Sequence, residues 1–218
     1  MNPNLRLFLV AVASTAIAGA YTATVYPSLP AQVPVHFNAA GQPDRFEPKE
    51  SGALITLWII LGMGVMFAVL PLLSPKSKSI EDFRKTYDII AIGTILFTAA
   101  IHVVVLNSAR GNELNPTVFG ILICILFGFL GNFMGKVTPN YYVGIRTPWT
   151  LESPVVWERT HRFAAKISVA SAVAGTLIIL TTGNAVVGIL GASLALLAAV
   201  PYSYFLHRKL EHSPDSAA

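Results

Sequence analysis

The chain has 218 residues, of which 54% are apolar and only 12% are charged, and its formal net charge is +4. A soluble domain usually carries about 25% charged residues, whereas a helix needs roughly 20 apolar residues to cross the core of a bilayer. Several runs meet that length, so the composition excludes an ordinary soluble domain and indicates an all-α integral membrane protein. The positive charge does not indicate nucleic-acid binding, because the basic residues lie between the apolar runs, where they orient a membrane protein.

Six transmembrane helices, joined by polar loops, are predicted in chain order. We expect the first to be a span rather than a cleaved signal peptide, because its apolar run exceeds a signal core and only Arg6 precedes it. The fifth should continue a helix that begins at Pro154 with Ser153 as its cap. The polar tail, residues 207–218, is predicted to be disordered. The predicted spans are Leu5–Tyr26, Gly52–Leu73, Asp88–Leu106, Pro116–Leu130 with an extension to Met134, Ile167–Thr181, and Ala185–Leu206.

The spans and loops repeat one rhythm in two three-span halves, residues 1–106 and 116–206. Each half has a span, a long loop, a span, a short loop and a span, and the long loops are residues 27–51 and 131–166. An odd number of spans gives the two halves opposite senses in the membrane, which permits a 3+3 inverted repeat. The run Pro34-Val-His-Phe in the first long loop echoes Pro139-Asn-Tyr-Tyr in the second.

The distribution of Lys and Arg predicts the orientation. Twelve of the fifteen lie in the N-terminus, the 74–88 loop, the 131–166 loop and the tail, whereas Arg45, Lys49 and Arg110 lie on the other side. The positive-inside rule therefore places both termini and the 131–166 loop in the cytoplasm. The proline-rich 27–51 loop then faces outward.

Candidate chemistry is sparse. The sequence contains no HExxH metalloprotease motif, no GxSxG elbow and no phosphate-binding glycine loop. On the outer side, His36, Asp44 and His102 have the right chemistry for a metal, but their spacing is not diagnostic, so they are weak candidates. No other cofactor is expected.

Arg146 is the most notable charge in the 131–166 loop. Pro148 favours an extended Thr147, and Trp149 suits the headgroup level. The planar guanidinium can hold a phosphate or carboxylate, or it can tie backbone carbonyls and act as a structural residue. The spacing of Glu158 and Arg162 predicts an i,i+4 pair on a helix.

The stretch GNFMGKVTPNYYVGIRTPWTLESPVVWERTHR, residues 131–162, resembles the SdpI family of bacterial membrane proteins, named for immunity to a secreted peptide toxin. The first-loop sequence LPAQVPVHFNAAGQPDRF resembles the small domain of unknown function that often precedes this motif. The resemblance implies toxin immunity or toxin sensing in the bacterial cytoplasmic membrane. In some members it implies binding of a cytoplasmic transcription repressor, and it implies no established catalysis.

Two hypotheses follow. In the first, the outer loop meets a membrane-active peptide toxin, and the inner loop gives the response or docks a cytoplasmic regulator. In the second, the protein is a membrane enzyme that acts on lipid or peptide through Arg146, Glu158 and His161. The candidate binding residues are Asn140, Gly144, Arg146, Thr147, Pro148, Trp149, Trp157, Thr160 and His161 in the inner loop, and His36, Asn38, Gly41 and Asp44 in the outer loop.

Overall fold

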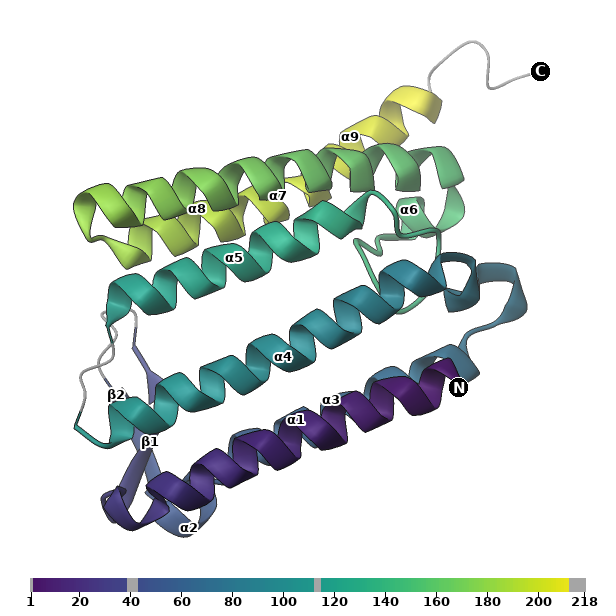
Figure 1. Cartoon of the computed structure of the whole chain (residues 1–218). Coiled ribbons are helices and arrows are strands. Elements are labelled where there is room, and N and C mark those ends of the chain that lie inside the picture. The colour runs from purple at the N-terminus through teal and green to yellow at the C-terminus, as the bar shows by residue number, and fades with distance from the viewer. Residues whose placement is uncertain (1, 39–42, 112–114, 212–218) are drawn as a thin grey trace. The chain divides into compact units, whose positions relative to one another are not determined.

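The long apolar runs form helices in the computed structural model, which describes residues 2–38, 43–111 and 115–211 (Figure 1). Within these residues, six helical segments are long and apolar enough to cross a membrane, so the six predicted helices are confirmed. The long helices are α1 (Pro3–Val25), α3 (Ile55–Leu73), α4 (Arg84–Ala109), α5 (Pro116–Met134), α7 (Pro154–Thr182), α8 (Ala185–Leu197) and α9 (Ala199–Glu211). The short elements are α2 (Lys49–Gly52), α6 (Pro148–Glu152) and the 3-10 turns η1 (Tyr26–Ser28), η2 (Lys76–Lys78) and η3 (Ile80–Phe83).

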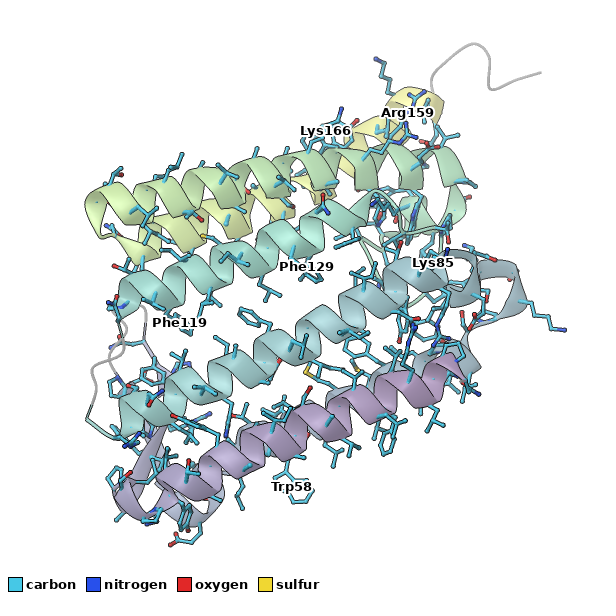
Figure 2. All side chains as sticks on the ribbon, viewed as in Figure 1. Trp58, Lys85, Phe119, Phe129, Arg159 and Lys166 are labelled. Carbon is cyan, nitrogen blue, oxygen red and sulfur yellow. The ribbon has the colours of Figure 1, made fainter. Side chains whose placement is uncertain are left out.

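The chain forms two compact units. The first consists of Met1–Leu73 and Asp88–Phe119, and the second of Ser74–Tyr87 and Gly120–Ala218. In the first unit α1 packs along α3, where Gly64 lets the α3 backbone approach Ala11. Side chains on the outside of α3 are apolar: Trp58 projects from the helix and is 68% exposed (Figure 2). Such a face suits contact with lipid rather than water.

The first long loop contains a β-hairpin, added to a framework that is helical as predicted. Strand β1 (Gln32–Phe37) pairs antiparallel with β2 (Pro43–Pro48). The extended run predicted from Val33 is therefore present, whereas the turn predicted around Gly41 lies outside the described residues.

The hairpin is anchored on the ends of the first-unit helices. Val33 is fully buried in a small core with Val25, Leu29, Ala53 and Leu106. Arg110 donates from Nε to the Ser28 hydroxyl at 2.9 Å. The first long loop is thus a packed element rather than a free connector.

Close backbone contact organises α7 and α8 in the second unit. The predicted turn at Gly183 is confirmed: Gly183 has φ 71° and its N–H donates to the Ile179 carbonyl, after which Asn184 caps α8. Gly175 and Gly188 then face each other across the two helices. A Cβ atom on Gly188 would lie 2.7 Å from the Gly175 carbonyl oxygen, so the crossing requires glycine there.

The predicted sixth span is divided into α8 and α9. Pro201 has no N–H to give to the carbonyl one turn earlier, and the helix is interrupted at Ala198. The predicted disorder of the tail is wrong for residues 207–211, which continue α9, whereas residues 212–218 lie outside the described residues.

Substituting glycine at the crossing tests this packing. We expect Gly188→Ala to destabilise the protein by about 1–3 kcal/mol, because the added methyl group overpacks the α7–α8 contact. Gly191→Ala on the same helix is the matched control, since nothing lies within 4 Å of its added Cβ. Thermal unfolding of the purified protein in detergent measures both. Equal melting temperatures for the two variants would contradict the close contact.

Candidate functional site

The motif loop, defined here as Val137–Ser153, is folded around the side chain of Asn140. The Asn140 carbonyl oxygen accepts from the N–H groups of Tyr142 and Val143 at 2.8 and 2.7 Å. Its amide nitrogen donates to the carbonyls of Thr138 and Val143 at 2.8 and 2.9 Å. Asn140 is fully buried, so all four bonds are shielded from water. One side chain therefore supplies the hydrogen bonds that regular secondary structure would otherwise provide.

The start of α7 holds this loop through Trp157 and His161. The indole Nε1 of Trp157 donates to the Val137 carbonyl at 2.7 Å, and its ring stacks on His161 with centroids 4.0 Å apart. The Ile145 N–H donates to Nε2 of His161 at 3.0 Å, and Nδ1 lies 2.8 Å from the Trp157 carbonyl. A carbonyl can only accept, so Nδ1 carries the proton and Nε2 is the acceptor. His161 is thus a neutral ring with both nitrogens engaged.

Gly144 is required where the loop passes this ring. Its φ is 111°, in the left-handed region that favours glycine. A Cβ atom there would also collide with Nε2 of His161. The glycine therefore allows the Ile145 N–H to reach the histidine.

Helix α6 follows, a short helix that is absent from the predicted elements. Thr147 is extended, as Pro148 predicted, and its hydroxyl accepts from the Thr150 N–H while the Thr150 hydroxyl accepts from the Thr147 N–H. Thr147-Pro148 has the same pattern as Ser153-Pro154, a capping residue followed by proline, so the sequence does contain a signal for the start of α6.

Trp149 fastens α6 to α9. Its Nε1 donates to the Ser203 hydroxyl at 2.7 Å, and its ring contacts Tyr204 and His207. The indole therefore has a protein partner rather than serving only as a headgroup-level anchor.

Lys78 connects the segment between α3 and α4 to the motif loop. Its ammonium donates to the Leu151 carbonyl at the end of α6 and lies 5.0 Å from the centroid of the Tyr141 ring. A cation is favourable at a helix C-terminus, where carbonyls are left without partners. No local pattern indicates this contact, because the two residues are distant in the chain.

Arg146 lies on the exposed side of the motif loop, beside exposed Pro148. Its guanidinium donates to the Tyr141 carbonyl, which is the backbone tie expected of a structural arginine. Thr160 is fully buried beneath the loop, and its hydroxyl has no hydrogen-bond partner in the described part of the chain. Thr160 therefore contributes to packing of α7 rather than to hydrogen bonding.

The predicted polar cluster does not assemble as one site. Glu158 pairs with Arg162 at 2.7 Å on an exposed face of α7, which confirms the predicted i,i+4 pair. His161 is buried and bonded to backbone, and Arg146 points to the Tyr141 carbonyl. No two of Arg146, Glu158 and His161 are joined by a hydrogen bond or ion pair in the described structure. The contacts that are present do not form an acid–base constellation.

The first-loop candidates separate in the same way. Nδ1 of His36 lies 2.5 Å from the Asp44 carboxylate across the hairpin, and both side chains are exposed. Asn38 follows β1 and is exposed, whereas Gly41 lies outside the described residues. His102 is buried in α4 with Nε2 2.7 Å from the Thr22 hydroxyl. Among the described residues, no three His, Cys, Asp or Glu side chains gather as a metal site, so the structure does not support the weak three-ligand hypothesis.

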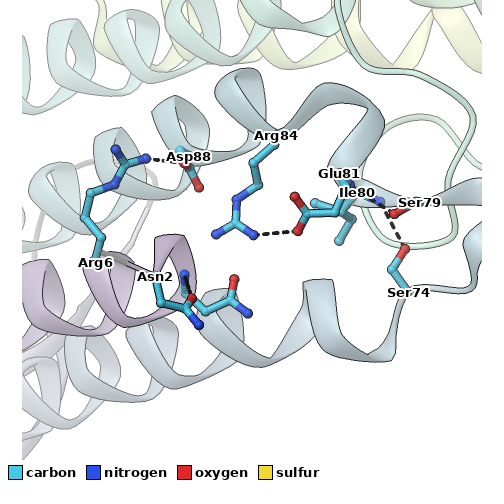
Figure 3. Close-up of polar contacts among 9 residues, drawn as sticks. Asn2, Arg6, Ser74, Ser79, Ile80, Glu81, Arg84 and Asp88 are labelled. Carbon is cyan, nitrogen blue, oxygen red and sulfur yellow. Dashed lines mark hydrogen bonds and ion pairs between the residues drawn. The ribbon is translucent and has the colours of Figure 1, made fainter.

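Sequence reasoning missed an ion pair in the first unit. Asp88 is buried in α4, and Arg6 of α1 donates to its carboxylate (Figure 3). In the sequence, Asp88 marks only the start of the predicted third span. Its partner lies 82 residues earlier, a separation that no local pattern reveals.

These observations define the class: a multi-pass helical membrane protein that carries a compact, internally bonded motif loop. Residues 136–205 match the SdpI/YfhL protein family, and residues 13–62 match a domain of unknown function, DUF1648. The resemblance to the SdpI family is thereby confirmed. The immunity protein SdpI of Bacillus subtilis (strain 168) is 25% identical over 192 residues, which cover 87% of this chain and 90% of that protein. No solved structure matches the chain.

Removing the Asn140 side chain should loosen the motif loop. Asn140→Ala deletes four buried hydrogen bonds, so we expect a loss of about 2–4 kcal/mol in stability. Limited proteolysis in detergent should then cut within residues 137–147. Asn132→Ala, at an exposed position on α5, is the control. Unchanged protease resistance in Asn140→Ala would show that other contacts hold the loop.

Proposed function

We propose that this protein is a membrane immunity or sensor protein that protects against, or responds to, a membrane-active peptide toxin. The observation that carries the proposal is the similarity to the B. subtilis immunity protein, which extends over 87% of the chain. The folded motif loop supports it, because its polar groups bond to one another and create a defined surface. A preformed surface favours recognition, since little ordering is needed on binding.

The geometry gives less support to a membrane enzyme. A general base needs a free lone pair near its substrate, but Nε2 of His161 already accepts from Ile145. Protonating that nitrogen would break the bond that holds the loop. Glu158 is likewise engaged by Arg162.

The exposed side of the motif loop is the proposed docking surface for a cytoplasmic regulator, such as a repressor. It presents the Tyr141 ring, 45% exposed, next to Arg146 and Pro148. Tyrosine and arginine are enriched among residues that dominate binding energy at interfaces. The Lys78 ammonium contacts the Tyr141 ring through a cation–π interaction.

The hairpin is the proposed contact for the toxin. Phe46 is 49% exposed on β2, next to exposed Arg45. An exposed aromatic ring beside a cation suits an amphipathic peptide lying at a membrane surface. This assignment places the hairpin on the outside of a bacterial cytoplasmic membrane and the motif loop inside, as the distribution of Lys and Arg predicts.

The 3+3 inverted repeat stays a prediction from the rhythm of spans and loops. The echo between Pro34–Phe37 and Pro139–Tyr142 does not extend to backbone conformation. The first run forms a strand, whereas the second is an irregular turn around Asn140. The proposed relation therefore concerns the spans and not the loops.

Single cysteines test the orientation. In a Cys124→Ala background, Arg45→Cys lies on the hairpin and Glu152→Cys at the end of α6, both at exposed positions. We expect an impermeant thiol reagent to label Arg45→Cys in intact cells and to label Glu152→Cys only after lysis. The reverse pattern would invert the topology and move the motif loop outside.

Survival of a sensitive bacterium expressing this chain tests the function. We expect the wild-type protein to raise the tolerated dose of a secreted membrane-active peptide. Arg146→Lys should lower that dose roughly ten-fold, the effect of about 1.4 kcal/mol, because lysine cannot reproduce the planar fork.

Arg159→Lys is the matched control, since Arg159 is also an exposed arginine but lies in α7 rather than in the motif loop. Membrane levels of both variants are compared by immunoblot. Full protection by Arg146→Lys would reduce Arg146 to a structural charge. No protection by the wild-type chain against any peptide of a broad panel would refute the immunity proposal.

A further inference from the structure

A groove runs along α5 and α7 within the second unit. Its apolar part encloses about 520 Å³, and Phe129 projects from α5 beside it (Figure 2). Side chains that line this part include Ile125, Phe129, Asn132, Val169, Val173 and Leu177. Ile125, Val173 and Leu177 are each 56% exposed, so the groove is open along its length.

The length of the apolar part matches one leaflet of a bilayer. It extends along α5 from Cys124 to Asn132, which is about 12 Å at the rise of an α-helix. The hydrocarbon of one leaflet is about 15 Å deep, half of the bilayer core. The cavity therefore has the depth that an acyl chain occupies.

The groove becomes polar at one end. Ile125, Phe129 and Asn132 follow one another at spacings of four and three residues, so they lie on one stripe of α5. Lys136 lies in the turn directly after α5 and lines a separate cavity of about 310 Å³, together with Glu158 of α7. The order from α5 into this turn is hydrocarbon, amide and ammonium.

The charges at this end favour an anion. Glu158 is already paired with Arg162, which neutralises the carboxylate. Lys136 lies 5.2 Å from the centroid of the Phe133 ring and makes no ion pair within the described residues. One positive charge is thus left in the turn that follows α5.

We propose that this groove binds one anionic phospholipid. An acyl chain lies in the apolar cavity between α5 and α7, the Asn132 amide faces the ester level, and the phosphate lies at Lys136. The order of apolar, amide and cationic groups along the groove is the order of acyl chain, ester and phosphate in such a lipid. A second protein helix would fill the apolar part but would leave the Lys136 charge without a partner.

Native mass spectrometry of the full-length protein tests the proposal, with phosphatidylglycerol and phosphatidylcholine of the same chain length offered in equal amounts. We expect one phosphatidylglycerol to be retained preferentially. Lys136→Gln should lower its apparent affinity about five-fold, the contribution of one basic residue to an anionic lipid. Val173→Trp should abolish retention of either lipid by filling the cavity. Inorganic phosphate should not compete.

Two controls separate the groove from the general surface. Lys166→Gln removes a lysine that projects from α7 away from α5 and lines neither cavity (Figure 2). Leu180→Trp adds the same indole at an exposed α7 position outside the groove. Both should retain the lipid as the wild-type protein does.

Three results of the lipid comparison would overturn the proposal. These are no preference between the two lipids, a preference that persists in Val173→Trp, or an equal loss in Lys136→Gln and Lys166→Gln. Competition by inorganic phosphate would also overturn it, because it would indicate a plain anion site. None of these measurements depends on toxin protection.

Discussion

The two ring nitrogens of His161 hold the motif loop in place. Nδ1 donates to the Trp157 carbonyl one turn earlier in α7, which fixes the tautomer and turns Nε2 toward the Ile145 N–H. The Trp157 ring, which stacks on His161, donates to the Val137 carbonyl. The same turn of α7 therefore binds both the beginning of the loop, at Val137, and its middle, at Ile145. Gly144 is required because any Cβ there would collide with this ring. The position of Arg146 and the start of α6 depend on that arrangement.

Much of the helical framework could be predicted because its causes are local. The lengths of the apolar runs predict the spans. Ser153 and Pro154 predict the start of α7, and the four-residue spacing predicts the Glu158–Arg162 ion pair. The missed features depend on partners far away in the chain. Nothing near Asp88 reveals Arg6, and nothing near Lys78 reveals the Leu151 carbonyl. Thr147-Pro148 has the residue types of a helix start, but the sequence prediction uses Pro148 only to favour an extended Thr147.

Two buried ionisable residues of α4, His102 and Asp88, are paired, which bears on the class of activity. The Thr22 hydroxyl donates to the Ala18 carbonyl and so accepts from Nε2–H of His102. Asp88 is bonded to Arg6. Ion-coupled transport relies on ionisable groups that exchange partners along a path, whereas these two sites have fixed protein partners. The framework is therefore better suited to holding loops in defined positions than to moving charge. This agrees with a binding role.

The proposed headgroup site at Lys136 is lined in part by residues of the motif loop and by the side chains that anchor it. The cavity that Lys136 lines is also lined by Trp157 and His161, the side chains that anchor the loop. A headgroup in that cavity therefore contacts an arrangement that exists only while the loop is folded on α7. Binding that requires the folded arrangement stabilises it in proportion to occupancy, since binding and conformation are linked. By the same linkage, a partner that reshapes the motif loop through Arg146 and Tyr141 would change the affinity of the groove for lipid. The docking surface and the bilayer would then be coupled through Trp157 and His161, with no ionisable group crossing the membrane.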